Sequence, residues 1–107
     1  MDRDSVFQAL ADANRRAILD RLATRNGQTL SALTGVLDIS RQAVTKHLKV
    51  LEEAGLVIAV RKGRERLHYL NPVPIHTEAI RWLTRFERTP IKALAALAEV
   101  DGREDDR

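Results

Sequence analysis

The sequence predicts a mainly α fold with one small β-hairpin, and three observations support this fold class. Apolar residues recur at spacings of three and four along most of the 107-residue chain, which is the helical period. One stretch, 57–70, instead combines residue types that are common in β-strands with a glycine-centred turn. Aromatic residues make up only 4% of the chain, so the core must be mostly aliphatic, which suits helices with a small sheet better than a β-sandwich.

Length and composition indicate one small intracellular domain. We expect residues 1–100 to form a single domain and the tail 101–107, "DGREDDR", to be disordered. The chain contains no cysteine, which excludes disulfides, thiolate metal sites and cysteine nucleophiles. The segment "MDRDSVFQAL" lacks the apolar centre of a signal peptide, and no apolar run approaches the ~20 residues that cross a bilayer. A cytoplasmic location is therefore expected.

The first half of the chain reads as three helices. Asp12 and Thr29 are placed to cap the second and third helices, and Gly27 in "RNGQ" ends the second. A tight turn, "LDIS", follows the third helix; Asp38 can serve there, because aspartate is one of the few non-glycine residues that tolerate a left-handed backbone. The apolar stripes comprise Val6, Phe7 and Leu10 in the first helix, Ile18, Leu19 and Leu22 in the second, and Leu30, Leu33 and Leu37 in the third.

A fourth helix begins after its cap Ser40 and ends at Gly55, the usual C-terminal stop. One face is apolar and should be buried; it holds Val44, Leu48, Leu51 and Ala54. The opposite face is polar and cationic; it holds Arg41, Gln42, Thr45, Lys46 and Lys49. The helix dipole also favours an anion near the first members of this set.

Two strands and a last helical region follow. The strands lie in 57–70 around a turn at 62–65, and the last helix is expected to begin at Pro74 or Ile75. Its broad apolar face holds Ala79, Ile80, Trp82, Leu83 and Phe86. Thr89-Pro90 then interrupts the pattern, and a further short helix is expected to contain Ile91, Leu94, Ala95, Leu97 and Ala98.

The order of these elements indicates a DNA-binding module. Two short helices joined by a tight turn, the second with polar groups facing outward, form a helix-turn-helix, and the hairpin is a wing. The segment Ser40–Arg66 has seven basic and three acidic residues, so it carries +4 in a chain whose net charge is +3. A local cluster of positive charge indicates an anionic partner, here double-stranded DNA.

Each cationic or polar side chain suggests its own contact. Arg41 can offer two donors to guanine, Gln42 can pair with adenine, and Thr45 can touch a thymine methyl. Lys46 and Lys49 are better suited to phosphates, because an ammonium is a point charge and lacks the paired, planar donors of a guanidinium. The wing would contact the DNA backbone or the flanking minor groove through Arg61, Lys62, Arg64 and Arg66.

The sequence resembles the ArsR/SmtB-type winged helix-turn-helix transcriptional regulators. The resemblance covers about residues 2–88 and rests on "DANRRAILDRLA", "SRQAVTKHLKVLEEAGLV" and "RKGRERLHYLNP". It implies a homodimer that binds a two-fold operator as a repressor, often at its own promoter. It also implies that the reading helix includes or adjoins Ser40, Arg41, Gln42, Thr45, Lys46 and His47. The dimer would be built from the first and last helices, where the candidates are Val6, Phe7, Leu10, Ile80, Trp82, Leu83 and Phe86.

The sequence departs from the metal-sensing members of that family. The third helix, "TLSALTGVL", carries no cysteine for a thiolate site. The last helix offers His76, Glu78 and Glu87, an incomplete set beside the Asp, His and Glu ligands of the other familiar site. No metal or other cofactor is therefore expected, and the chain looks closer to the branch without an evident metal site.

Several alternative readings stay open. A metal- or ligand-gated sensor would share the fold, and a winged helix used only for protein contacts would lack the basic face. RNA binding would favour an exposed aromatic platform, which is missing. An enzyme is disfavoured because the sequence has no glycine-rich phosphate loop and no nucleophile elbow. His68 is expected at the surface or beside the DNA groove. Arg15 and Arg16 could touch phosphates, but a solvated face or an ion pair with Asp12 or Asp20 is slightly favoured.

Overall fold

A computed structural model describes residues 3–87, 92 and 94–99, and its elements follow the predicted order. The elements are α1 (Arg3–Leu10), α2 (Ala13–Thr24), α3 (Leu30–Val36), α4 (Arg41–Glu53), β1 (Val57–Lys62), β2 (Glu65–Leu70) and α5 (Val73–Thr84). Residues 94–99 are helical, as expected of the further short helix. The predicted break at Thr89-Pro90, Ile91 and the tail 101–107 lie outside the described residues.

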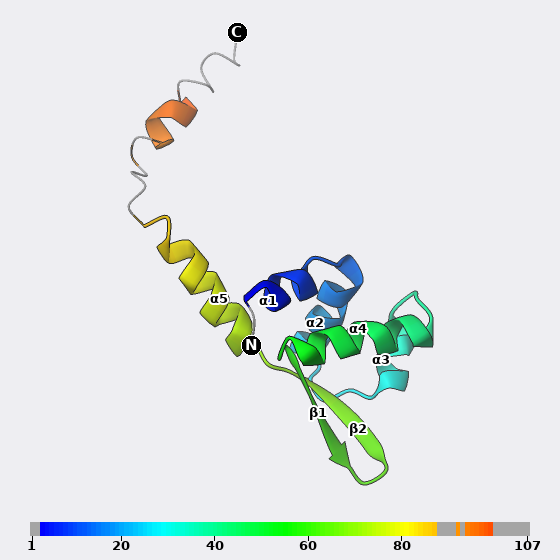
Figure 1. Cartoon of the computed structure of the whole chain (residues 1–107). Helices are drawn as coiled ribbons and strands as arrows, with labels where there is room; N and C mark the ends of the chain where they lie inside the picture. The colour runs from blue at the N-terminus through cyan, green and yellow to red at the C-terminus, as the bar shows by residue number, and fades with distance from the viewer. Residues whose placement is uncertain (1–2, 88–91, 93, 100–107) are drawn as a thin grey trace.

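An aliphatic core holds the helices together. α2 and α4 pack against each other, α1 contacts both, and α3 contacts α4 (Figure 1). The predicted stripes of α2 and α4 are buried, so the amphipathic patterns of these helices are confirmed. The core residues are Val6, Ala9, Ile18, Leu19, Leu22, Leu33, Val44, Leu48, Leu51, Ala54, Leu56 and Val57.

Three helix N-termini have the side-chain caps that the sequence predicts. Asp12 accepts from the backbone N–H groups of Asn14 and Arg15, at 2.8 and 3.1 Å. Thr29 accepts from the backbone N–H of Ala32 at 3.1 Å. Ser40 caps α4 in the same way, with its hydroxyl 3.1 Å from the nitrogen of Ala43. Each cap satisfies a backbone donor that the helix itself leaves unpaired.

The turn between α3 and α4 differs from the prediction. No non-glycine residue among the described residues has a positive φ, so Asp38 does not adopt the left-handed backbone that the sequence allowed there. The chain instead leaves α3 at Leu37 in an extended conformation, with φ −105° and ψ 140°. It enters α4 at Ser40, which is also extended, and Asp38 and Ile39 bend the chain between them without a positive φ.

The hairpin is regular and is tied to the helices at its base. β1 and β2 are antiparallel, in register from Val57 opposite Leu70 to Lys62 opposite Glu65. Gly63 has φ 64° and no other residue of the turn is left-handed, which is the pattern of a type II′ turn. At the base, the backbone N–H of His68 donates to the carbonyl of Gln28 at 2.8 Å, and two N–H groups donate in return. The hairpin therefore continues into the segment that precedes α3.

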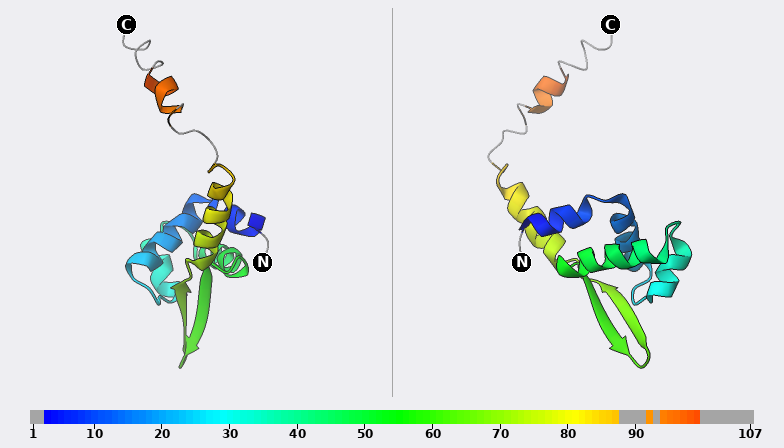
Figure 2. Two further views of the ribbon diagram at one scale, coloured as in Figure 1. Left: turned by 90° about the vertical axis from the view of Figure 1, so that its left-hand side faces the viewer. Right: turned by 45° about the vertical axis from the view of Figure 1, so that its right-hand side comes forward.

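α5 begins at Val73, slightly earlier than the sequence suggests, and lies against α1. The side chain of Asn71 accepts from the backbone N–H of Val73, which supplies the turn into the helix. Figure 2 shows α5 and the hairpin leaving the helical core in different directions. As a result, the apolar face of α5 is only partly covered within this chain.

Candidate nucleic-acid interface

One face of α4 is exposed, polar and cationic. This reading face consists of Arg41, Gln42, Thr45, Lys46 and Lys49, all of which are exposed. The opposite side of the helix is buried in the core. No acidic residue occurs between Ser40 and Leu51, so nothing on this stretch of the helix neutralises the positive charge.

Two residues of the reading face are oriented by short hydrogen bonds. The guanidinium of Arg41 donates to the hydroxyl of Ser31 on α3 at 3.0 Å. The hydroxyl of Thr45 donates to the carbonyl of Arg41 at 2.9 Å. Arg41 is thus held between the two helices of the helix-turn-helix. Ser40, also predicted at this site, uses its hydroxyl in the α4 cap.

His47 is set apart from the other predicted residues of the reading helix. Its Nδ1 lies 3.4 Å from a guanidinium nitrogen of Arg15, and its Nε2 lies 4.0 Å from a carboxylate oxygen of Asp12. Only 17% of its side chain is exposed. His47 therefore faces the N-terminus of α2 and contributes to helix packing there.

The wing carries the four predicted basic residues, all exposed: Arg61, Lys62, Arg64 and Arg66. Arg66 differs from the others because its guanidinium contacts a carboxylate oxygen of Glu52 on α4 at 2.7 Å. This ion pair joins the wing to the reading helix. Sequence reasoning missed it because 14 residues separate the partners and no local pattern links them.

The expectation that His68 lies at the surface was wrong. His68 is 4% exposed, and its Nδ1 is 2.9 Å from the carbonyl oxygen of Gln28. A carbonyl oxygen only accepts, so Nδ1 carries the hydrogen. The bridge between β2 and Gln28 places His68 on the buried side of the hairpin.

The guanidinium groups of Arg15 and Arg16 donate to backbone carbonyls at the C-terminal end of α1, contacts that the sequence did not predict. Arg15 donates to the carbonyls of Gln8 and Ala9, each at 2.8 Å. Arg16 donates to the carbonyl of Leu10 at 2.7 Å. Cationic donors at the last carbonyls of a helix satisfy orphan acceptors and complement the helix dipole. These two side chains thus secure α1 to α2.

The predicted dimer residues divide into a core group and an exposed group. Val6 is buried in the core of the single chain, and Leu10 packs against that core. Trp82 and Phe86 make an edge-to-face contact, with ring centroids 5.2 Å apart and planes at 74°. The exposed group, here called the apolar patch, consists of Phe7, Ile80, Trp82, Leu83 and Phe86.

The described residues contain neither a cluster of metal ligands nor a membrane-spanning helix. No group of three His, Cys, Asp or Glu side chains there is arranged to hold a metal ion. Likewise, the described part of the chain has no helix whose length and apolar character would let it cross a membrane.

An exposed cationic helix beside a basic hairpin defines the class: a DNA-binding winged helix-turn-helix protein. Comparison with known families agrees, because a helix-turn-helix domain family matches residues 10–60. The HTH-type regulator YuzN of Bacillus subtilis is 44% identical over 88 residues, covering 77% of this chain and 96% of that protein. The HTH-type regulator Rv2034 of Mycobacterium tuberculosis is 39% identical over 104 residues, covering 96% and 92%. The repressor SdpR of Bacillus subtilis is 30% identical, covering 78% and 90%.

Solved structures give the same result. An ArsR-like transcriptional regulator from Rhodococcus matches with a TM-score of 0.72 and 38% identity, covering 92% of this chain and 91% of that one. A homodimeric winged helix-turn-helix domain from Mycobacterium bovis has the same fold at 24% identity, with a TM-score of 0.62 and 81% of each chain covered. The chain belongs to the ArsR family of helix-turn-helix transcriptional regulators. It is a DNA-binding regulator and not an enzyme.

Proposed function

We propose that this protein is a dimeric repressor that reads an imperfect palindromic operator, including one at its own promoter. The observation that carries the proposal is the reading face of α4, which is exposed and cationic and has no acidic residue among its members. The similarity to SdpR, a transcriptional repressor, supports repression as the mode of action.

The first turns of α4 supply the base contacts in this proposal. A helix enters the major groove with its N-terminal side chains toward base edges. Arg41 reads guanine through its fork, and Gln42 reads adenine through its amide. Lys46 and Lys49 neutralise phosphates and fix the register of the helix on the duplex. On the wing, the exposed bases Arg61, Lys62 and Arg64 contact the flanking backbone.

A second copy of the chain covers the apolar patch. Five large apolar side chains, exposed on α1, on α5 and just beyond the end of α5, form a surface typical of a protein interface. Beside them, Glu78 is 9% exposed and one of its oxygens has no hydrogen-bond partner. A buried acceptor is costly until a donor reaches it, and a second copy can bring one. Two reading helices related by a dyad would then meet half-sites ~34 Å apart.

Fluorescence anisotropy with a labelled duplex tests the proposal. We expect the DNA upstream of the gene for this protein to bind more tightly than a scrambled duplex of equal length, and to compete selectively. Sedimentation in parallel should show a dimer at micromolar concentration. Equal affinity for every duplex would contradict operator reading, and a monomer would contradict the dyad.

A metal-gated version of the same repressor is a separate outcome that can be measured. The incomplete ligand set of His76, Glu78 and Glu87 argues against it. Calorimetry with Zn²⁺, Ni²⁺ and Co²⁺ on chelator-stripped protein distinguishes the two. Tight binding of a metal that also releases DNA would replace the proposal with a metal-gated repressor.

A further inference from the structure

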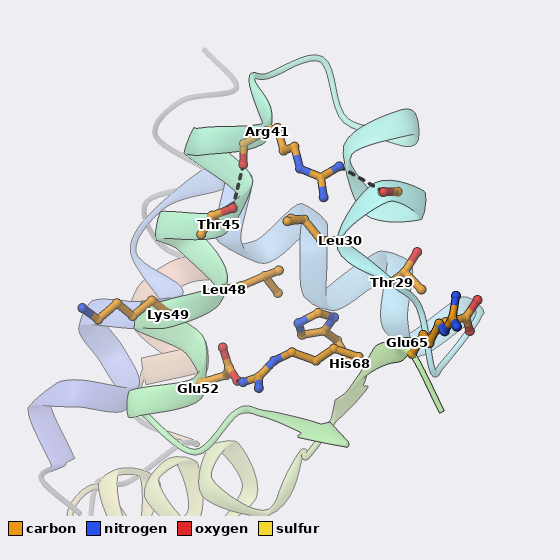
Figure 3. A pocket seen from close by; sticks show the side chains of 12 residues that line it. Thr29, Leu30, Arg41, Thr45, Leu48, Lys49, Glu52, Glu65 and His68 are labelled. Atoms are coloured by element: carbon orange, nitrogen blue, oxygen red, sulfur yellow. Dashed lines mark hydrogen bonds and ion pairs between the residues drawn. The ribbon is translucent and has the colours of Figure 1, made fainter. Parts of the chain in front are cut away.

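A cavity of about 670 Å³ lies between α3, α4 and the wing. Pockets for small organic molecules usually measure ~300–1,000 Å³, so this one can hold a ligand of moderate size. Figure 3 shows it from close by. Its lining residues are Thr29, Leu30, Ser31, Arg41, Thr45, Leu48, Lys49, Glu52, Arg64, Glu65, Arg66 and His68.

The lining changes character from one end to the other. Arg41 lies at one end of the cavity and His68 at the other, with the side chains of Leu30 and Leu48 between them (Figure 3). Lys49 extends away from the cavity, so its ammonium does not face the interior. A cationic end, an apolar middle and an end where His68 lies beside the Arg66–Glu52 ion pair therefore follow one another.

His68 offers the cavity an unused hydrogen-bond acceptor. Its side chain is buried, and Nδ1 donates to the carbonyl of Gln28. In the neutral ring, a hydrogen on Nδ1 leaves Nε2 with a free lone pair. No hydrogen bond from a described residue reaches Nε2. A ligand in the cavity can supply the missing donor.

We propose that this cavity binds a small organic carboxylate with an apolar body and a hydroxyl group at its far end. The carboxylate pairs with the guanidinium of Arg41, whose planar fork suits two carboxylate oxygens. The body lies on Leu30 and Leu48, and the hydroxyl donates to Nε2 of His68. Hydroxylated aromatic acids have this chemistry.

A row of DNA phosphates fits the same cavity less well. Glu52 and Glu65 line it among four basic residues, so a polyanion meets more repulsion there than a ligand with a single carboxylate. Of the bases at the Glu52 end, Arg66 is already paired with Glu52 at 2.7 Å. The apolar middle also gives a phosphate nothing to contact. An uncharged body with a single carboxylate meets these conditions.

The ligand would compete with DNA, and this second step rests on the proposed function. Arg41 and Thr45 belong to the reading face and also line the cavity. A carboxylate bound to Arg41 withdraws the guanidinium from guanine and adds negative charge beside the duplex. The ligand therefore acts as an inducer that releases the operator.

Two pairs of probes test the binding step without any DNA. The probes are 4-hydroxybenzoate with benzoate, and 4-hydroxycinnamate with cinnamate, titrated into the full chain and followed by two-dimensional NMR. We expect saturable binding with a Kd below about 1 mM. The hydroxylated member should bind about tenfold more tightly, because it alone reaches His68.

Two variants assign the contacts. His68→Asn keeps an N–H for the carbonyl of Gln28 but removes Nε2, so the hydroxylated and plain probes should bind it equally. The side chain of Arg41 is exposed, so Arg41→Gln should fold normally. It should weaken the binding of both probes in each pair. If His68→Asn fails to fold, Arg41→Gln with carboxylate and carboxamide probes still decides whether the carboxylate end exists.

Opposite results overturn the inference. The inference would be contradicted if no probe caused saturable changes in the NMR signals of the cavity residues. It would also be contradicted if folded His68→Asn still bound the hydroxylated probes more tightly than the plain ones. If inorganic phosphate bound as tightly as the organic acids, the cavity would be a phosphate-binding site only. Operator binding is measured separately. Failure to bind an operator would contradict only the proposed function. Probe binding that leaves the operator affinity unchanged would contradict the inducer role.

Discussion

The basic side chains of this protein differ in whether a partner within the chain already occupies their donor groups. Lys62 is open, and Arg41 makes only a neutral bond to a hydroxyl. Arg15 and Arg66 are committed, the first to carbonyls of α1 and the second to Glu52. A base that is already paired gains less from a phosphate, so the open group should dominate the energetics of DNA binding.

Replacing Arg41 by alanine should reduce both affinity and selectivity for the operator. We expect Arg41→Ala to cost ~1–3 kcal/mol and to relax the preference at one base pair in each half-site. The matched control is Lys62→Ala, which should weaken all sequences alike and lower the salt slope by about 1. Anisotropy across a panel of single-base operator variants measures both. Unchanged affinities for operator and random DNA in Arg41→Ala would remove α4 from the role of reading helix.

Asp12 should make the stability of the protein depend on pH in the acid range. The hydrogen bond from the backbone N–H of Arg15 lowers the pKa of Asp12 below 3.8; a second bond from Asn14 and the nearby His47 and Arg15 add to it, and partial burial opposes it. With the folded-state pKa lower than the unfolded one, the stabilisation is complete above 3.8 and is lost as pH falls through the folded-state pKa.

Asp12→Asn keeps a capping oxygen and removes the charge. We therefore expect the wild type to resist urea better than Asp12→Asn at neutral pH. The difference between their unfolding midpoints should shrink as the pH is lowered past 3.8. A difference that stays constant over that range would assign the effect to hydrogen-bond geometry and not to charge.

At the scale of elements, local chemistry was predictable and long-range contacts were not. The caps at Asp12, Thr29 and Ser40 act within three residues, so the sequence displays them directly. The burial of His68 depends on Gln28, 40 residues away, and no periodicity reports that contact. The reading face was visible because buried and exposed positions alternate along α4. Its link to the wing through Glu52 was not.

The glycines should respond to alanine according to their backbone and surroundings. Gly27 has φ 75°, and an added Cβ would meet the ring of Tyr69 at 3.0 Å, so Gly27→Ala should destabilise the wing base by more than ~1 kcal/mol. Gly35, inside α3, has no atom within 4 Å of the added Cβ. Gly35→Ala is the control and should stabilise by ~0.5–1 kcal/mol. Urea denaturation measures both, and equal effects would contradict the backbone argument.

Across the whole molecule, two surfaces lie on different elements and do different work. The reading face lies on α4 and is polar, whereas the apolar patch lies on α1, on α5 and on Phe86 just beyond α5. Because the two do not share residues, a second copy can cover the patch and leave the reading face free. Dimer assembly and base recognition can therefore be changed separately.

Trp82→Ala should weaken the dimer and leave the fold of each chain intact. Trp82 is 49% exposed in the single chain, so its removal opens no core cavity. Loss of an interface tryptophan commonly costs at least ~2 kcal/mol, and the dimer Kd should rise about 30-fold or more. The control is Val36→Ala, equally exposed at 48% but at the end of α3. Sedimentation velocity compares them, and a Trp82→Ala dimer as tight as the wild type would place the interface elsewhere.

Because the backbones of His68 and Gln28 are bonded to each other, the hairpin shares its root with the entry to the helix-turn-helix. Its tip is different: an added Cβ at Gly63 would meet nothing within 4 Å. Extra residues inserted between Lys62 and Glu65 would lengthen the loop at little entropic cost. Evolution, or an engineer, could thus extend the reach of this protein along a duplex while the geometry of base recognition stays as it is.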